Sequence, residues 1–306
     1  MRYAFIGLGN LGSHLAASLC REGFDVTVHD LNRRAADRHI ALGAKWAASP
    51  AEAAANVDAV ITCLPSPKAS DAVVNGERGV FSALKRGGTW IEMSTTDQNE
   101  IARIAKIAAA KGIAVLEAPV TGGVHRAAAG EISVLVGGDK TVFDAHRAAL
   151  EAMGGEIFHM GPLGSAAVIK VITNMLAFIH LVAAGEALML AKRGGLDLAQ
   201  AFAAIRASSG NSFVHETESQ VILNGSYNIG FTMDLACKDL GFALEFGRKF
   251  GVPLELAGLT EQTFIRARQQ FGGEAWSSMV VKLLEDALKT DLRAPGFPEV
   301  LSQGPQ

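Results

Sequence analysis

The sequence predicts an α/β protein of two parts, in which a doubly wound parallel sheet precedes an all-α region. Over the first half, short and continuously apolar runs alternate with helical patterns, as expected for parallel strands buried on both faces. From Gly164 onward the patterns are long, apolar and helical, without a convincing strand. The 306 residues also exceed the ~100–200 of an ordinary domain. We therefore expect one domain over 1–162 and a second over 163–306.

The expected strands of the first domain are short and mostly apolar throughout. They lie over 3–6, 26–30, 59–64, 89–93, 113–117 and 133–136. Helical segments alternate with them, among others over 11–22, 51–56 and 98–111. Alternating strands and helices of this kind build a sheet that carries helices on its faces.

The second domain is expected to consist of helices. They run over 164–193, 197–208, 213–224, 234–250, 254–270 and 276–290. At 1.5 Å per residue the first would be ~45 Å long, and it is apolar nearly all round. Such a helix must be covered by other helices or by a second subunit. We therefore expect a homo-oligomer, most simply a two-fold dimer.

Composition excludes several classes of protein. Hydrophobic residues make up 49% of the chain and charged residues 19%, which excludes a disordered or tail-like chain. The net charge of −3, without a lysine or arginine run, gives no sign of a nucleic-acid partner. Cys20, Cys63 and Cys237 lie far apart, so their spacing predicts neither a zinc site nor a disulfide framework.

Nothing in the sequence predicts a membrane partner. The most membrane-like stretch, 171–185, is shorter than the ~18 apolar residues that spanning requires. The N-terminus runs directly into an expected strand instead of a signal peptide. We therefore expect a cytoplasmic protein with a buried helix at this stretch.

A glycine-rich turn follows the first expected strand and opens the first expected helix. Gly7 permits the tight turn, Gly9 lets the backbone approach a pyrophosphate, and Gly12 allows close packing of helix and strand. The helix N-terminus offers free N–H groups to the phosphates. The motif predicts a Rossmann-type dinucleotide site whose loop contributes Gly7, Gly9, Asn10, Leu11 and Gly12.

Asp30 bears on the choice of cofactor. It ends the second expected strand, about 18 residues after Gly12, against the ~20 usual for this motif. A carboxylate there accepts hydrogen bonds from the ribose of NAD and repels the 2′-phosphate of NADP. Arg33 and Arg34 lie near enough to reach a phosphate, although a solvated helix start is their simpler interpretation. NAD is the expected cofactor, and NADP is the alternative.

Lys170 stands inside an apolar helical pattern, between Ile169 and Val171. Burial lowers the pKa of a lysine toward the range that general acid–base chemistry uses. Asn174, one turn later, projects from the same face. A lysine that only reaches out to water from the start of a helix explains this segment equally well.

Several segments, in order along almost the whole chain, resemble the β-hydroxyacid dehydrogenase family, of the 3-hydroxyisobutyrate dehydrogenase and tartronate semialdehyde reductase type. These are 5–12, Glu117-Ala118-Pro119-Val120-Thr121-Gly122-Gly123, the stretch from Gly161 to Asn174, and Lys238-Asp239-Leu240. The resemblance implies a dehydrogenase with a nicotinamide cofactor, assembled as dimers or tetramers through its α-domain.

The resemblance also implies a role for each matching residue. Lys170 would be the general acid and base, and Asn174 would orient Lys170 and the substrate. The hydroxyl and backbone N–H groups of Thr121, Gly122 and Gly123 would bind the substrate carboxylate. The further cofactor contacts would be Leu64, Ser94, Thr95 and Lys238. An ordinary turn remains the alternative for the glycine segment, and an ion pair with Asp234 or Asp239 remains the alternative for Lys238.

Some positions depart from the family pattern. Thr121 stands where members usually have serine, and Thr173 argues against 6-phosphogluconate dehydrogenase, which has histidine there. Lys170 argues against imine reductases, which generally lack it. His125 and Arg126 replace small residues, and we interpret Arg126 as a solvated loop cation in preference to a partner for a second acidic group.

These observations favour an NAD-dependent dehydrogenase that converts the 3-hydroxyl of a small 3-hydroxy acid into a semialdehyde or 3-oxo acid. The first alternative is an NADPH-dependent semialdehyde reductase. The second, of another class, is a non-catalytic dinucleotide-binding module, because a fold does not establish a function. The sequence does not name the substrate.

Overall fold

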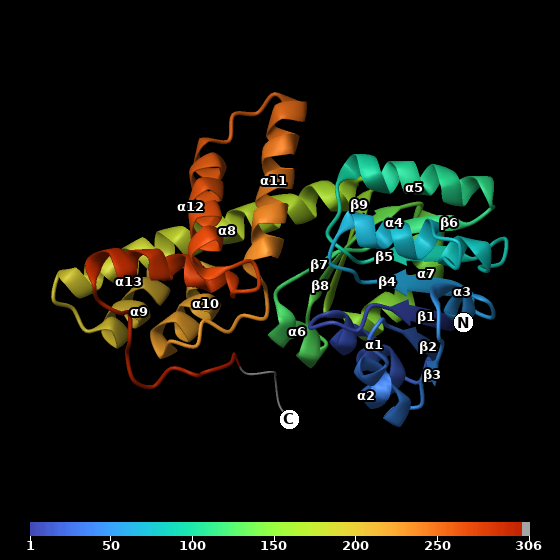
Figure 1. Ribbon diagram of the computed structural model, residues 1–306, viewed down its shortest axis with the longest axis horizontal. Coiled ribbons are helices and arrows are strands. Elements are labelled where there is room, and N and C mark those ends of the chain that lie inside the picture. Colours follow the sequence, from blue (N-terminus) through green and yellow to red (C-terminus); the bar gives the residue numbers. More distant parts are fainter. Residues whose placement is uncertain (302–306) are drawn as a thin grey trace. The chain divides into compact units, whose positions relative to one another are not determined.

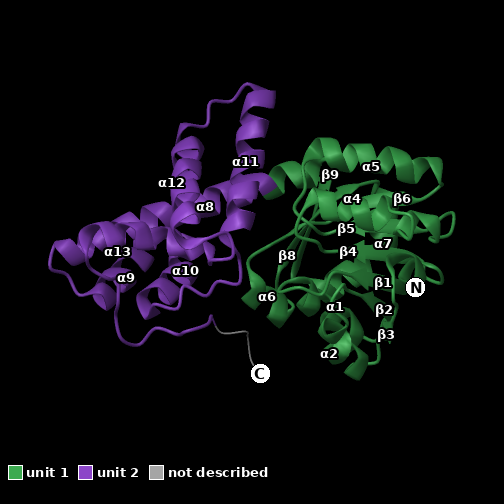
Figure 2. Cartoon of the chain, viewed as in Figure 1, with its two compact units in different colours: residues 1–170, 303–306 green, residues 171–302 purple. Residues whose placement is uncertain are grey.

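The computed structural model describes residues 1–301 and divides them into two compact units (Figure 2). The first unit comprises Met1–Lys170, and the second begins at Val171. The sequence instead places the boundary at 162/163, where the pattern changes from strands to helices. Residues 302–306 of the expected second domain lie outside the described range.

The first unit is built on one sheet, which confirms the predicted doubly wound architecture (Figure 1). Within the described residues its order is β3-β2-β1-β4-β5-β6-β8-β7, and β9 also pairs with β8. The parallel strands are β1 (Arg2–Ile6), β2 (Asp25–His29), β3 (Lys45–Trp46), β4 (Ala59–Thr62), β5 (Thr89–Glu92) and β6 (Ala114–Glu117). Antiparallel pairing joins β8 (Ser133–Gly138) to β6 and to β7 (Val120–Thr121), whereas β9 (Glu156–Gly161) is parallel to β8.

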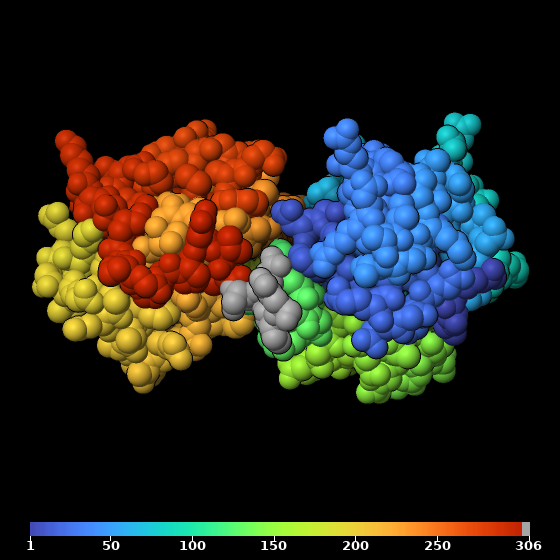
Figure 3. All heavy atoms as spheres, turned by 90° about the horizontal axis from the view of Figure 1, so that it is seen from below, coloured from blue at the N-terminus to red at the C-terminus, as the bar shows by residue number. Residues whose placement is uncertain are grey.

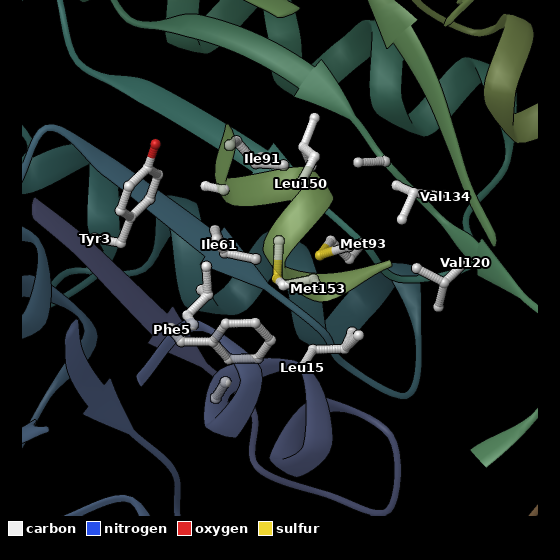
Figure 4. Close-up of a cluster of buried hydrophobic side chains, with 14 of the residues drawn as sticks. Tyr3, Phe5, Leu15, Ile61, Ile91, Met93, Val120, Val134, Leu150 and Met153 are labelled. Carbon is white, nitrogen blue, oxygen red and sulfur yellow. The ribbon is translucent and has the colours of Figure 1, made fainter. Parts of the chain in front are cut away.

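Helices cover both faces of this sheet. They are α1 (Gly12–Arg21), α2 (Asp37–Ala41), α3 (Pro50–Ala54), α4 (Pro67–Asn75), α5 (Gln98–Ala110), α6 (Val124–Ala129) and α7 (Lys140–Met153). Phe5 packs with Leu15 of α1 and Leu150 of α7 on one face (Figure 4), and Ile6 packs with Ile104 of α5 on the other. Successive residues of β1 thus enter opposite cores, which explains why the strand is apolar and buried from Tyr3 to Ile6.

Three strands of the first unit were absent from the prediction. Two of them, β3 and β7, contain only two residues each, so no periodic pattern can develop. The third, β9, has exposed and half-buried residues in alternation, among them the exposed Phe158 and Met160. It therefore lacks the continuous apolar run by which the central strands were identified.

The second unit is helical over its described residues, which confirms the predicted all-α region. Its helices are α8 (Ser165–Arg193, whose first residues belong to the first unit), α9 (Leu198–Arg206), α10 (Phe213–Asn224), α11 (Met233–Phe250), α12 (Glu255–Phe271) and α13 (Lys282–Leu288). The expected helix over 276–290 is divided into a 3-10 turn, Ser277–Val281, and α13. The segment after α13 lies along the end of α10, where the Ala294 N–H donates to the Leu223 carbonyl, and Figure 3 shows this segment in red.

Among the described residues, α8 is long and apolar enough to cross a membrane by length and composition alone. Phe178, Leu181 and Leu188 of this helix are nevertheless buried in the core of the second unit, together with Leu240 of α11 and Phe264 of α12. The same sequence pattern is typical of a helix at the centre of a helical domain. We therefore describe α8 as a core helix.

Candidate active site

The expected site residues of the first unit gather at the carboxyl ends of neighbouring parallel strands. Gly7 follows β1, Asp30 follows β2, Leu64 follows β4 after one further residue, and Ser94 follows β5 in the same way. Strand order reverses between β1 and β4, which is where open α/β sheets bind their ligands.

The glycine loop has the geometry that its predicted roles require. Gly7 has a φ of +100°, and a Cβ there would collide with the carbonyl oxygen of Cys63. A Cβ at Gly12 would collide with the carbonyl oxygen of Gly7. A Cβ at Gly9, in contrast, would meet nothing within 4 Å. Gly7 and Gly12 therefore allow tight packing, while Gly9 leaves open space that a pyrophosphate can use.

The Asp30 carboxylate is fixed against this loop. One oxygen accepts the Leu8 N–H at 2.8 Å and the other accepts the Asn32 N–H at 2.8 Å. Because a carboxylate oxygen accepts more than one hydrogen bond, ribose hydroxyls can still bind to it. Arg33 is engaged elsewhere, with Asp37 at 2.8 Å and with the Trp46 ring at 4.9 Å. These contacts fit the nicotinamide dinucleotide with an unmodified ribose better than its 2′-phosphate form.

Asp30→Ala should weaken NAD binding and narrow the preference for NAD over NADP. The variant loses charge-assisted hydrogen bonds to the ribose, together worth roughly 1.5–3 kcal/mol, and also loses the repulsion of a 2′-phosphate. Fluorescence titration with NADH and NADPH measures both affinities. Asp25→Ala, at the other end of β2, is the matched control, and a native protein that prefers NADPH would refute the role of Asp30 at once.

The loops after β4 and β5 are tied to each other. The Leu64 N–H donates to Ser94 Oγ at 2.7 Å, and the Ser94 N–H donates to Glu92 Oε1 at 2.8 Å. Glu92 is buried at the end of β5, and burial raises the pKa of its carboxyl group. The structure thus brings the expected cofactor contacts Leu64 and Ser94 together, with Thr95 next in the chain, around an acid that the sequence did not single out.

The expected carboxylate-binding segment connects β7 to α6. Thr121 is paired with Ser133 in the sheet, whereas Gly122 and Gly123 have φ values of +123° and +87°. Two consecutive residues in this region of φ require glycine. The segment is therefore a strand-to-helix connection anchored in the sheet, and not an isolated surface turn.

Glu117, at the end of β6, holds the N-terminus of α8. Its Oε1 accepts the N–H groups of Gly164 at 2.6 Å and Ala166 at 2.8 Å, and its Oε2 accepts the Ala167 N–H at 3.1 Å. Burial raises the pKa of this carboxyl group, and the three N–H donors act in the opposite direction. Gly137 leaves room for the carboxylate, because a Cβ there would collide with it. The first turn of α8 is thereby fixed to the sheet.

Lys170 and Asn174 follow one turn apart on α8, and both are buried, with 7% and 9% of their surfaces exposed. Within the second unit the Asn174 amide donates to Asp239 Oδ2 at 2.6 Å. Lys238 lies 2.8 Å from the other oxygen of Asp239, whereas Asp234 pairs with Arg268. The structure therefore contains the ion pair between Lys238 and Asp239 that the sequence analysis gave as the alternative for Lys238. Asp239, which the sequence suggested only as a possible ion-pair partner of Lys238, contacts two expected site residues, Asn174 and Lys238.

Comparison with known proteins shows similarity to dehydrogenases that bind a nicotinamide dinucleotide, as the geometry of the site indicates. A family model described as the NAD binding domain of 6-phosphogluconate dehydrogenase matches residues 2–161. A second family model, described as NAD-binding of NADP-dependent 3-hydroxyisobutyrate dehydrogenase, matches residues 164–284. The 2-(hydroxymethyl)glutarate dehydrogenase of Eubacterium barkeri is 35% identical over 93% of this chain and 95% of its own.

The chain belongs to the β-hydroxyacid dehydrogenase family.

Further relatives of this β-hydroxyacid dehydrogenase are also named as dehydrogenases of hydroxy acids. The NAD-dependent L-serine dehydrogenase of Pseudomonas aeruginosa is 32% identical over 92% of this chain and 97% of its own. The solved 3-hydroxyisobutyrate dehydrogenase of Salmonella typhimurium is 30% identical, covers 92% of this chain and 99% of its own, and superposes with a TM-score of 0.86. The predicted family, fold, reaction class and nicotinamide cofactor are confirmed, and the chain is an oxidoreductase of the hydroxyacid dehydrogenase class.

Proposed function

We propose that this β-hydroxyacid dehydrogenase oxidises the 3-hydroxyl of a small 3-hydroxy acid with NAD, and that Lys170 is its general acid and base. The observation that carries the proposal is the buried lysine on the turn of α8 that follows the Glu117 cap. A lysine side chain that is buried and carried on a fixed helix turn can exchange a proton with a substrate oxygen without competition from bulk water.

Oxidation of the hydroxyl removes one hydride from carbon and one proton from oxygen. The bound nicotinamide supplies the acceptor for the hydride from the carbon that bears the hydroxyl. Lys170, in its neutral form, takes the proton of that hydroxyl as the carbonyl forms, and returns it in the reverse direction. Asn174 is positioned by Asp239 and orients the lysine and the substrate oxygen. No metal is needed to balance this reaction.

The substrate carboxylate is assigned to the Thr121–Gly123 segment. The Thr121 hydroxyl and the N–H groups of Gly122 and Gly123 form an anion-binding turn on a strand that the sheet holds in place. Fixing the acid group fixes the neighbouring carbon relative to the nicotinamide, and orientation of this kind lowers the barrier to reaction. Leu64, Ser94 and Thr95 are assigned to the cofactor, together with Lys238.

The relatives support a common substrate class. L-Serine and 2-(hydroxymethyl)glutarate, which appear in the names of two of them, both carry a hydroxymethyl group on the carbon next to a carboxylate. A panel of 3-hydroxy acids, assayed with NAD and with NADP by nicotinamide absorbance, tests the proposal. We expect turnover of at least one acid with NAD as the better cofactor. Better use of NADPH with a semialdehyde would favour the alternative reductase, and no turnover would refute the proposal.

We also propose that the second unit supplies the interface of a two-fold homodimer or a homotetramer. On α8, Leu176 and Leu190 keep 44% and 75% of their surfaces exposed, and on α12 Leu256 and Leu259 are also largely exposed. Exposed leucines on the helices of one unit are candidates for a protein interface. The burial of Phe178, Leu181 and Leu188 in a helical core supports our description of α8 as a core helix, and we propose a cytoplasmic protein.

Light scattering at micromolar concentration should give at least twice the 32.1 kDa of one chain. Leu190→Asp should shift the equilibrium toward the monomer, because a carboxylate in an apolar interface loses its hydration without a partner. Leu42→Asp, the same substitution at an exposed leucine of the first unit, is the control and should leave the mass unchanged. A stable monomer of the native protein would refute the assembly.

A further inference from the structure

Arg126 lies in α6, directly after the Thr121–Gly123 segment, and its side chain turns back onto that segment. Its Cδ lies 3.1 Å from the position that a Cβ on Gly122 would occupy. The residue is half-buried, so its side chain does not extend freely into water. The interpretation of Arg126 as a solvated loop cation does not agree with this position.

The Arg126 guanidinium has no hydrogen bond or ion pair with any residue of 1–301. Five arginines among residues 1–301 are paired with carboxylates, namely Arg33, Arg103, Arg147, Arg268 and Arg293, and Arg126 is not one of them. The acid nearest in sequence, Glu131, donates its backbone N–H to the Arg126 carbonyl at 2.8 Å, but its exposed side chain forms no pair with the guanidinium. A half-buried guanidinium without an anion is unfavourable, so an anion from outside the chain would stabilise it.

Arg126 is also the one formal charge of this segment at neutral pH. His125 lies against Gly123, and burial, helped by the charge of Arg126, lowers the pKa of its imidazole. A histidine with a lowered pKa is neutral at pH 7, whereas a guanidinium stays charged. The segment therefore presents neutral donors from Thr121 to Gly123, followed by a single cation.

We propose that Arg126 binds a second carboxylate of the substrate, so that the enzyme selects 3-hydroxy dicarboxylic acids over monocarboxylic ones. This inference rests on the proposed function, in which the Thr121 hydroxyl and two N–H groups bind the first carboxylate. Those three donors already satisfy that group, which leaves the guanidinium for another. The planar fork of arginine matches a carboxylate with two parallel hydrogen bonds. The substrate that names the Eubacterium barkeri relative carries two carboxylates.

A matched pair of substrates tests the selection. 2-(Hydroxymethyl)glutarate and 2-(hydroxymethyl)pentanoate differ only in that a methyl group replaces the distal carboxylate of the first. We expect the native enzyme to have a kcat/KM at least about tenfold higher for the dicarboxylate. In Arg126→Gln the ratio of the two kcat/KM values should fall at least about tenfold, and Arg126→Lys should retain part of it. Arg147→Gln, on the exposed side of α7, should keep the native ratio.

The outcomes separate this inference from the proposed function. A native enzyme that uses both acids equally well overturns the role of Arg126 and leaves the proposed function intact. Equal losses for both acids in Arg126→Gln also overturn it, because the guanidinium would then serve the first carboxylate or the fold. Failure to turn over either of these acids, or any other 3-hydroxy acid with either cofactor, overturns the proposed function itself.

Discussion

Lys170→Ala should lower kcat at least ~10²-fold in both directions, which is the usual contribution of a positioned acid or base. The lysine is assigned to the proton on the substrate oxygen and not to the dinucleotide, so the dissociation constant for NADH should barely change. Stopped-flow or steady-state absorbance measures kcat, and fluorescence titration measures NADH binding. A low kcat with native NADH binding indicates a lost proton donor, whereas weaker NADH binding would indicate a disrupted cofactor site.

Two further measurements make this result specific. Lys192→Ala, at the other end of the same helix, removes a surface lysine paired with Asp291 and should leave kcat close to native. A primary amine added to Lys170→Ala should restore part of the rate, because a diffusible ammonium group can occupy the space left by the side chain. Near-native turnover in Lys170→Ala would show that another group carries the proton.

The dinucleotide half of the site was predictable from the sequence because each of its parts is local. Gly7, Gly9 and Gly12 are required by turn and packing geometry within a few residues of one another. Asp30 follows from the position of the second strand, whose end the apolar pattern marks. The loop requires glycine and the ribose requires an acid, and both residue types can be recognised directly in the sequence.

The contacts of Glu117 and Asp239 were not predictable in the same way. Glu117 contacts Gly164, 47 positions further along the chain, and Asp239 contacts Asn174, 65 positions before it. An acid at a strand end before an alanine-proline pair is the local signal for Glu117, and it does not specify the partner of the carboxylate. Lys238 was ambiguous because Asp234 and Asp239 both lie within four residues of it, and the pairing of Asp234 with the distant Arg268 is visible only in the fold.

The position of the domain boundary has a related physical cause. The sequence pattern changes near Pro162, where strands give way to helices. In the structure, α8 begins at Ser165 and its first turn stays with the first unit, to which Lys170 also belongs. Glu117 explains the difference, since it bonds the start of α8 to the sheet. A helix that begins in one unit and continues into the next carries no mark of the change in its own sequence.

Glu117→Ala should destabilise the protein and reduce kcat, because three N–H groups at a buried helix start lose their acceptor. Each buried donor left unpaired costs about 1–3 kcal/mol, so the free energy of unfolding should fall by several kcal/mol. Glu117→Gln keeps one acceptor oxygen but turns an NH2 group toward one of these donors, so its loss should be intermediate. Urea unfolding followed by circular dichroism measures both variants.

The matched control is Asp97→Ala, which removes a half-buried carboxylate that caps α5 by accepting backbone N–H groups. The free energy of unfolding should fall by the ~1 kcal/mol typical of an N-cap. Below their unfolding temperatures, the Glu117 variants should still bind NADH but show a lower kcat, because the first turn of α8 no longer fixes Lys170. If kcat stayed native in a folded but weakened Glu117→Gln, the carboxylate would stabilise the helix without positioning the lysine.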